Sequence, residues 1–325
     1  MSIAGKMRLN LWSAVHYYLQ MLLKRFLLIA SFLLVLVSSA GAEVYSYTDN
    51  SLVIGYARTY KTSANESLIE TARKFDLGYN GITEANPLLD PFVPGAGASV
   101  RIPTAWILPD LKTYEGIVIN LSEMRLFYFF KQKGSRLVKT FPIGIGSEGN
   151  DTPEGVYKIV GKITKPSWHV PASIREEKPE LPAIVPPGPD NPLGSHAMRL
   201  SLGSYLIHGT DKPWAVGRRA THGCIRLYPE DIPELFKLVS VGTKVTIVRQ
   251  PVKVGAKNGK IYLEVHKDEG ENHERYLNMA MELLKKKKLL KTINSEKLYR
   301  ALTEKSGMPV EISGMESLWA RRDTE

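Results

Sequence analysis

The sequence predicts an α+β protein with a mainly β centre, a small mixed unit before it and helices after it. Three observations predict this class. Short apolar runs separated by polar turns recur between residues 116 and 248, as in β-rich domains. Apolar residues are spaced as on one helix face within 67–75, and a longer helical pattern covers 272–290. We therefore expect an N-terminal unit over 58–105, a β-rich domain over 115–250 and an extension over 251–325.

The composition is that of an ordinary globular protein, since 43% of the 325 residues are hydrophobic and 23% are charged. A chain of this length is long enough for a sizeable core and for two or three domains. The formal net charge of +10 suits an anionic polymer such as cell wall, a membrane surface or nucleic acid. Because no nucleic-acid-binding motif accompanies the charge, we expect no nucleic-acid partner.

Residues 1–42 have the pattern of a secretory signal peptide. Lys24 and Arg25 precede an apolar run over 26–37, and small residues at 40–42 suit cleavage. The apolar run is short for a transmembrane helix. We expect an exported protein with a cleaved signal; an uncleaved anchor in the inner membrane is the alternative.

The unit over 58–105 is predicted to hold two short helices and a closing strand. The first helix is expected over 67–75, with Asn65 as its N-cap. A second helical turn is expected at 81–85 and a strand at 99–103. The next segment, 104–114, is expected to be a linker because it is short and contains a proline.

The β-rich domain contains several runs that alternate or are continuously apolar. The strands expected from them are 116–121, 125–131, 137–141, 155–163, 198–207 and 242–248. A short helix is expected over 231–239. A proline-rich segment over 165–190 interrupts the strands, and a loop of that length is usually functional or disordered. Its Trp168 is not typical of disorder.

The extension is predicted to contain a strand over 260–266 and a helix over 272–290. Ser295 is the expected N-cap of a further helix. Four consecutive lysines at 285–288 suit a solvated helix end, where cations complement the helix dipole. A membrane-surface contact is the alternative for these lysines.

Cys224 is the only cysteine in the chain, and a histidine, His222, and a glycine precede it. A second histidine, His208, lies upstream beyond a turn-rich loop. A thiolate attacks carbonyls far better than a thiol, so the thiol needs a base or a positive neighbour. A histidine can take that proton near neutral pH and return it later. The spacing alone leaves two interpretations open, a catalytic nucleophile and a small buried hydrophobe.

These residues resemble the signature of the YkuD-type L,D-transpeptidases. That signature is a histidine and, after a spacer, Ser/Thr-His-Gly-Cys, a hydrophobic residue and Asn or Arg. The matching segments here are 208–210 and 221–226, and further family-like segments occur in order at 142–146, 152–155 and 188–194. Many members have Asn where this chain has Arg226, whereas the ErfK/YbiS-like branch resembles it in using Arg. The resemblance covers about residues 115–250 and implies a β-sandwich or barrel with a short capping helix.

The resemblance implies a cysteine enzyme that transfers acyl groups on peptidoglycan. Cys224 would form a thioester with the meso-diaminopimelate of a tetrapeptide stem and release D-alanine. His208 would act as base and then as acid, with its other ring nitrogen held by the main-chain carbonyl at Gly209. Backbone amides of Gly223 and Cys224 would form the oxyanion hole, with His222 in a supporting role.

Three further residues are expected to contact the substrate, namely Arg226, Trp168 and Thr221. The fork of Arg226 suits a carboxylate, and a structural ion pair is equally consistent with the sequence. Trp168 would lie in a lid over the donor peptide, or would instead pack as a core plug. We expect no cofactor and no metal, because one cysteine with dispersed histidines makes a poor zinc site.

The unit over 58–105 resembles a LysM module, a small β-α-α-β fold that binds glycans containing N-acetylglucosamine. The resemblance rests on Ser67-Leu68, Ala72, Asn86-Pro87 and Ile102-Pro103. The chain departs from the usual pattern at Asn65-Glu66, where LysM sequences have Gly-Asp. A spacer that merely packs on the catalytic domain is the alternative.

The sequence leaves the acyl acceptor open. A second stem peptide, a lysine of an outer-membrane lipoprotein and a free D-amino acid are all conceivable, and the ErfK/YbiS-like resemblance favours the lipoprotein. With water as acceptor the protein would be an L,D-carboxypeptidase, and a non-catalytic wall-binding protein is the alternative of another class. The resemblance also implies a periplasmic location and covalent inhibition by carbapenems.

Overall fold

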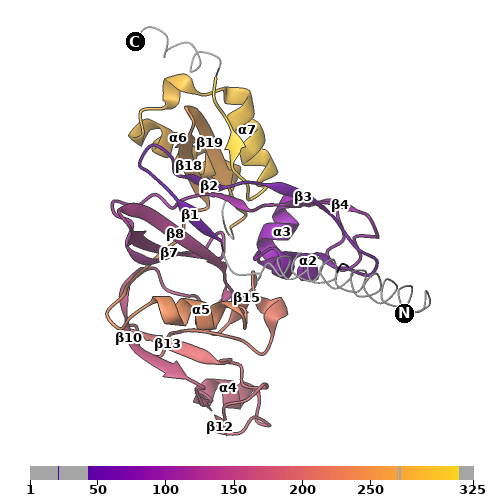
Figure 1. Cartoon of the computed structure of the whole chain (residues 1–325), viewed down its shortest axis with the longest axis vertical. Helices are drawn as coiled ribbons and strands as arrows, with labels where there is room; N and C mark the ends of the chain where they lie inside the picture. The colour runs from indigo at the N-terminus through magenta and orange to yellow at the C-terminus, as the bar shows by residue number, and fades with distance from the viewer. Residues whose placement is uncertain (1–20, 22–42, 269, 271, 315–325) are drawn as a thin grey trace, which may run out of the picture. The chain divides into compact units, whose positions relative to one another are not determined.

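A nine-stranded sheet runs through the computed structural model, in which residues 21, 43–268, 270 and 272–314 are described (Figure 1). Two neighbouring pairs are parallel, β6 with β17 and β14 with β16, and the other pairs are antiparallel. Apart from Met21, the predicted signal over 1–42 lies outside the described residues. In spatial order the strands are β1 (Val44–Ser46), β8 (Ser135–Pro142), β7 (Arg125–Gln132), β6 (Gly116–Asn120), β17 (Lys244–Val248), β10 (Gly155–Thr164), β13 (His196–Leu200), β14 (Leu206–His208) and β16 (Ile225–Arg226).

Both faces of the sheet are buried at its strand β6. Ile117 and Ile119 point into one hydrophobic core and Val118 into a second one, because successive side chains of a strand face opposite ways. The first core also holds buried side chains of α5 (Asp231–Leu238), the predicted short helix. The second core is shared with the N-terminal unit, so this unit packs directly on the back of the sheet.

The N-terminal unit has the β-α-α-β order that its sequence predicts. Its elements are β3 (Arg58–Lys61), α2 (Leu68–Lys74), α3 (Tyr79–Ala85) and β4 (Ser99–Ile102), and the two strands pair antiparallel. The predicted N-cap Asn65 is wrong. Ser67 caps α2 instead, because its side chain accepts from the Glu70 amide while Glu70 reaches back to the Ser67 amide.

The segment 104–114, expected to be a linker, contains a buried strand. This strand, β5 (Ala105–Ile107), pairs antiparallel with β2 (Val53–Gly55), and Trp106 is only 5% exposed. Proline and short length suggested a connection, but residues 105–107 are all buried and Trp106 packs in the second core. The N-terminal unit and the sheet are therefore joined through a continuous packed interior.

The extension folds around a core of its own, drawn in yellow and orange in Figure 1. Its elements are β18 (Val252–Lys257), β19 (Lys260–Val265), α6 (His273–Lys286), η2 (Leu290–Thr292), α7 (Ser295–Glu304) and β20 (Val310–Glu311). The predicted cap Ser295 is wrong by one residue, because the Asn294 side chain accepts from the Lys297 amide. In the lysine run, the Lys287 ammonium pairs with Asp110 at 3.0 Å, so this lysine is not simply solvated.

Short elements build the surface around the end of the sheet. β9 (Ile145–Gly146) pairs parallel with β15 (Arg219–Thr221), and η1 (Pro213–Ala215) precedes β15. The proline-rich segment is ordered into β11 (Trp168–His169), α4 (Ala172–Glu177) and β12 (Ile184–Val185), with β11 and β12 paired antiparallel. The expected strand at 198–207 is two strands, β13 and β14, joined by a turn.

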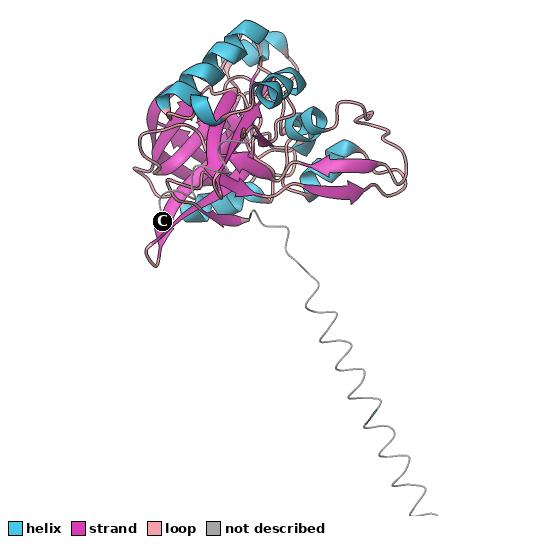
Figure 2. Ribbon diagram, turned by 90° about the horizontal axis from the view of Figure 1, so that it is seen from above, coloured by secondary structure: helices cyan, strands magenta, loops and turns pink. Residues whose placement is uncertain are grey.

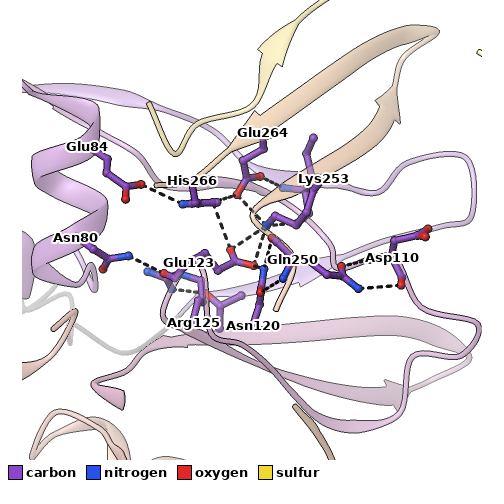
Figure 3. A network of polar contacts seen from close by, with 12 residues as sticks. Asn80, Glu84, Asp110, Asn120, Glu123, Arg125, Gln250, Lys253, Glu264 and His266 are labelled. Carbon is purple, nitrogen blue, oxygen red and sulfur yellow. Dashed lines mark hydrogen bonds and ion pairs between the residues drawn. The ribbon is translucent and has the colours of Figure 1, made fainter. Parts of the chain in front are cut away.

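A buried network of charges ties the three parts together (Figure 3). The Lys253 ammonium of β18 lies 2.8 Å from carboxylate oxygens of both Glu123 and Glu264. His266 continues the network, with one ring nitrogen 2.7 Å from Glu264 and the other 3.1 Å from Glu84 of α3. Glu84, Glu123 and Lys253 come from the N-terminal unit, the sheet domain and the extension, respectively.

The predicted α+β class with a mainly β centre is confirmed. Figure 2 shows strands in each part of the described chain, with helices packed beside them. None of the helices within the described ranges has the length and apolar character needed to cross a membrane.

Candidate active site

The parallel pairing of β14 with β16 brings the predicted histidine and cysteine together. Ile207 lies opposite Ile225 and His208 opposite Arg226, so Cys224 lies opposite Leu206. Side chains two residues apart on a strand share a face, and partners in register do too. His208, Cys224 and Arg226 therefore lie on one face at the end of the sheet.

These side chains line a cavity of about 470 Å³. Cys224 is partly exposed there, whereas His208 is only 3% exposed. All six side-chain candidates from the sequence line this one cavity: Trp168, His208, Thr221, His222, Cys224 and Arg226. A cavity of this size is typical of ligand sites, which range over about 300–1,000 Å³.

The proton on His208 is assigned by its neighbour. Its Nδ1 lies 2.7 Å from the Gly209 carbonyl oxygen, which can only accept, so Nδ1 carries the hydrogen. In the neutral ring with this tautomer, Nε2 is the basic nitrogen. Burial, followed by the Arg226 charge, lowers the pKa of His208 to about 3, and hydrogen bonds to the carbonyls of Gly209 and Pro192 act against this shift.

The cysteine is also neutral at pH 7. Burial raises the pKa of the Cys224 thiol, although a backbone hydrogen bond from Leu206 and the Arg226 charge act in the opposite direction. The resting pair is therefore a thiol beside an uncharged imidazole, and not a thiolate–imidazolium pair.

Two threonines fix the backbone of residues 221–224, here called the nucleophile loop after its candidate nucleophile, Cys224. Thr221 Oγ1 donates to the Cys224 carbonyl at 2.7 Å and accepts from the Gly223 amide at 3.2 Å. Thr152 Oγ1 donates to the Gly223 carbonyl at 2.8 Å. Gly223 itself has φ +96°, and a Cβ there would lie 2.5 Å from the Tyr205 ring, so only glycine fits.

Arg226 carries a buried polar atom that nothing in the described chain satisfies. Its Nε is buried without a hydrogen-bond partner among the described residues. Its main chain is held on both sides, by Gly144 through bonds of 2.8 and 2.9 Å and by the bond from Leu227 to His208 at 2.8 Å. A rigidly mounted guanidinium with spare donors on a cavity wall suits a carboxylate ligand.

The same region is matched by known proteins. A family model described as the L,D-transpeptidase catalytic domain matches residues 115–247. The chain is also 41% identical over 262 residues to the probable L,D-transpeptidase YcfS of Escherichia coli (strain K12), which covers 76% of this chain and 80% of that protein. The chain belongs to the L,D-transpeptidase family. This confirms the predicted family.

Two more relatives cover most of this L,D-transpeptidase. The probable L,D-transpeptidase YbiS of Escherichia coli (strain K12) is 36% identical over 291 residues, 85% of this chain and 94% of that one. The probable L,D-transpeptidase ErfK/SrfK of the same organism is 39% identical over 262 residues, 77% of this chain and 83% of that one. The similarity therefore extends beyond the catalytic domain into the neighbouring parts of the chain.

The proline-rich segment of this L,D-transpeptidase forms part of the cavity wall. Trp168 is half-buried and lines the cavity, and Ile174 of α4 lines it as well. His222 is exposed, with its Nε2 3.7 Å from a Glu177 carboxylate oxygen of the same segment. His222 thus contacts this segment and lies on the exposed side of the nucleophile loop.

Sequence reasoning missed two residues that shape the site. Thr152 lies in the family-like segment 152–155, which was noted without a role for this hydroxyl, and Tyr205 was not singled out. The threonine directly before a proline was the available signal. Nothing local marks Tyr205, because its contact with Gly223 arises only when β14 and the nucleophile loop pack together.

One cluster outside the cavity has metal-like spacing. Donor atoms of Glu123, Glu264 and His266 lie within 4.8 Å of one another and are buried. The Lys253 ammonium already lies 2.8 Å from both carboxylates. A side chain of the protein therefore supplies the positive charge that a metal ion would otherwise bring. The cluster therefore fits an internal ion network better than a metal centre.

Proposed function

We propose that this protein is a cysteine L,D-transpeptidase of peptidoglycan in which Cys224 is the nucleophile. The observation that carries the proposal is that the Cys224 thiol, directly before β16, and the ring of His208, on the parallel neighbour β14, line one cavity. The donor is a tetrapeptide stem, and the thioester forms on its meso-diaminopimelate. Its product is an amide linkage to an amine, on a lipoprotein lysine or on another stem.

In the acylation step, His208 Nε2 takes the thiol proton while sulfur attacks the stem carbonyl. The bond to D-alanine breaks, and the same proton leaves on the D-alanine amine. The Gly209 carbonyl keeps the ring in the required tautomer. The amides of Gly223 and Cys224 stabilise the oxyanion, for which Gly223 exchanges its 3.2 Å bond to Thr221.

Through Arg226, a bound substrate would raise the basicity of His208. Its charge contributes to the lowered pKa of His208. A substrate carboxylate bound to Arg226 offsets that charge, so His208 becomes a stronger base when the cavity is filled. Trp168 and the segment around it cover the bound peptide and exclude water from the thioester.

The remaining parts fit a protein that works on the cell wall. We assign residues 115–250 to catalysis, 58–105 to a LysM-like unit that binds glycan strands, and 251–325 to a supporting extension. Residues 1–42 direct export, which puts the enzyme in the periplasm with its substrate. Carbapenems present a reactive carbonyl to the same thiol and acylate it.

The test compares the wild-type protein with Cys224→Ala after incubation with sacculi rich in tetrapeptide stems. Mass spectrometry of the wild type is expected to show an adduct on Cys224, loss of D-alanine, and muropeptide dimers or a lipoprotein-linked product. Tripeptides without any new linkage would assign hydrolysis instead. Identical results from both proteins would refute the catalytic role and leave a wall-binding protein.

A further inference from the structure

A second cavity, of about 520 Å³, adjoins the nucleophile loop. Arg226 lines both this cavity and the one that contains Cys224. The second cavity is walled by the N-terminal unit and by the loop that leads to Cys224. Its lining residues include Ile69, Phe92, Lys212, Trp214, Arg218 and Arg226.

The charges in this cavity are all positive. Lys212, Arg218 and Arg226 line it, and none of its described lining residues is acidic. Burial lowers the pKa of the Arg226 guanidinium, and Asp211, which precedes Lys212, lies near enough to act in the opposite direction, so it offsets part of the positive charge. The Nε atoms of Arg218 and Arg226 are buried without a hydrogen-bond partner in the described part of the chain. The Arg218 guanidinium is held 3.5 Å above the centre of the Tyr79 ring. Fixed guanidinium groups with unused donors suit a carboxylate.

Two aromatic side chains supply an apolar wall. Phe92 is 61% exposed and Trp214 is 55% exposed, so both rings can offer apolar surface to a ligand in this cavity. The wall is also rigid, because the Tyr79 and Asn80 amides of α3 donate to the Val216 and Gly217 carbonyls at 3.1 Å each.

We propose that this second cavity binds the acyl acceptor, an amine that carries a carboxylate of its own. The inference rests on the proposed thioester at Cys224. Once the donor stem fills the first cavity, the amine needs another approach to the thioester. Arg226 lies two residues after Cys224 and borders both cavities, so a carboxylate held by Lys212 and Arg218 on the far side of Arg226 directs its amine toward the thioester.

The transfer step balances without any further reagent. The amine nitrogen attacks the thioester carbonyl, a C–N bond forms and the C–S bond breaks. The proton lost by the amine passes to His208 and then to the departing thiolate. The products are an amide and the free thiol of Cys224. A free D-amino acid, a peptide ending in lysine and a stem peptide all present an amine together with a carboxylate.

The experiment separates acylation from transfer in Lys212→Glu and Trp214→Ala. Each full-length variant is first acylated with a tetrapeptide donor and followed by mass spectrometry. D-alanine, a peptide with a C-terminal lysine and a tetrapeptide stem are then offered as acceptors, each beside its carboxamide. Lys131→Glu, an exposed charge reversal on β7, is the matched control.

We expect acylation to stay within about twofold of wild type in all variants. Lys212→Glu should raise the concentration of carboxylate acceptor needed for half-maximal transfer by roughly tenfold, the effect of losing one charge-assisted contact. The carboxamides should be affected far less, and Trp214→Ala should weaken both forms. The acceptor with the largest loss identifies the natural source of the amine.

Three outcomes would overturn the inference. Lys212→Glu could leave the preference for carboxylate over carboxamide unchanged, or the variants could lose acylation itself, which would assign the cavity to the donor. The third outcome is a wild-type protein that never forms an adduct on Cys224. That result refutes the proposed function and the inference together, whereas the first two leave the proposed function intact.

Discussion

At the scale of single residues, the candidate site keeps the Cys224 thiol and the His208 ring uncharged at neutral pH. Burial acts in opposite directions on the two groups, since it disfavours the charged form of each: it lowers the pKa of His208 and raises that of Cys224. A neutral thiol is also less open to oxidation than a thiolate. In the proposed mechanism, protection of the resting thiol and activation by substrate therefore share one physical cause, the burial of both groups.

This arrangement predicts an unusual pH profile. His208 is already in its basic form above about pH 3, so the acylation rate is expected to be flat between pH 5 and 8. It should rise at higher pH as the thiolate of Cys224 begins to form. Stopped-flow or mass-spectrometric acylation across this range checks the expectation, with circular dichroism to verify folding at each pH. An acid limb with a midpoint near the ordinary pKa of histidine, about 6.5, would contradict it.

The location of the candidate site could be predicted from sequence because cysteine and histidine are scarce in this chain. One cysteine and a nearby histidine leave few alternatives, and the structure places both in one cavity. The supporting hydroxyls could not be assigned in the same way. Thr221 was expected to face the substrate, yet its Oγ1 bonds the main chain of the nucleophile loop, a role that depends on the loop's folded path.

At the scale of elements, the first turn of α3 is capped by another part of the chain. Its amides at Tyr79 and Asn80 meet the carbonyls of the loop at 216–217. The contact is close enough that a Cβ on Gly78 would lie 2.7 Å from Gly217 Cα, so glycine is required on both sides. The N-terminal unit thereby braces the loop that leads to β15 and Cys224.

A pair of carboxyl groups near this junction predicts pH-dependent stability. Desolvation by the surrounding protein raises the pKa of Asp76 to about 7. The side chain of Asp231 forms a hydrogen bond with the carboxyl group of Asp76. A raised pKa means that the native state binds more protons than the unfolded one, so this contribution is complete below about pH 4 and is lost toward pH 7. Asp76→Asn should flatten that fall in urea-unfolding free energy. Asp190→Asn, at an exposed position, is the control and should reproduce the wild-type slope.

The strands and helices themselves followed from periodicity, whereas their ends and junctions did not. The helix at 68–74 was placed by its apolar spacing, but its cap was placed two residues early because Asn and Ser both cap helices well. The strand at 105–107 was mistaken for a linker because three residues are too few to show the two-residue alternation of a strand. Both errors concern features decided by tertiary partners.

At the scale of the whole molecule, the Lys253 network couples the extension, which has a core of its own, to the N-terminal unit and the sheet domain, which share a core. Burial opposes protonation of His266, but hydrogen bonds to Glu264 and Glu84 raise its pKa to about 10, so it is a cation at pH 7. Removing Lys253 would leave Glu123 and Glu264 buried with less positive charge. Ionic contacts of this kind contribute little net stability but are costly to break on one side only.

Lys253→Met is therefore expected to lower the free energy of unfolding by about 3–5 kcal/mol. Thermal and urea unfolding measure the loss, and adding Glu264→Gln should recover part of it. Lys260→Met on the adjacent strand removes an exposed lysine paired with Glu311 at 3.1 Å and should change stability little. Equal unfolding midpoints for Lys253→Met and Lys260→Met would show that the network does not support the fold.

Because the chain has a single thiol, a probe attached to it reports on one known position. Because Cys224 is the only sulfhydryl and is partly exposed in the cavity, any thiol-directed dye, spin label or affinity tag attaches at one known place. The stoichiometry of labelling then counts functional molecules in a preparation, and the signal of the label reports what enters the cavity. No cysteine has to be removed beforehand, so the natural sequence can be used unchanged.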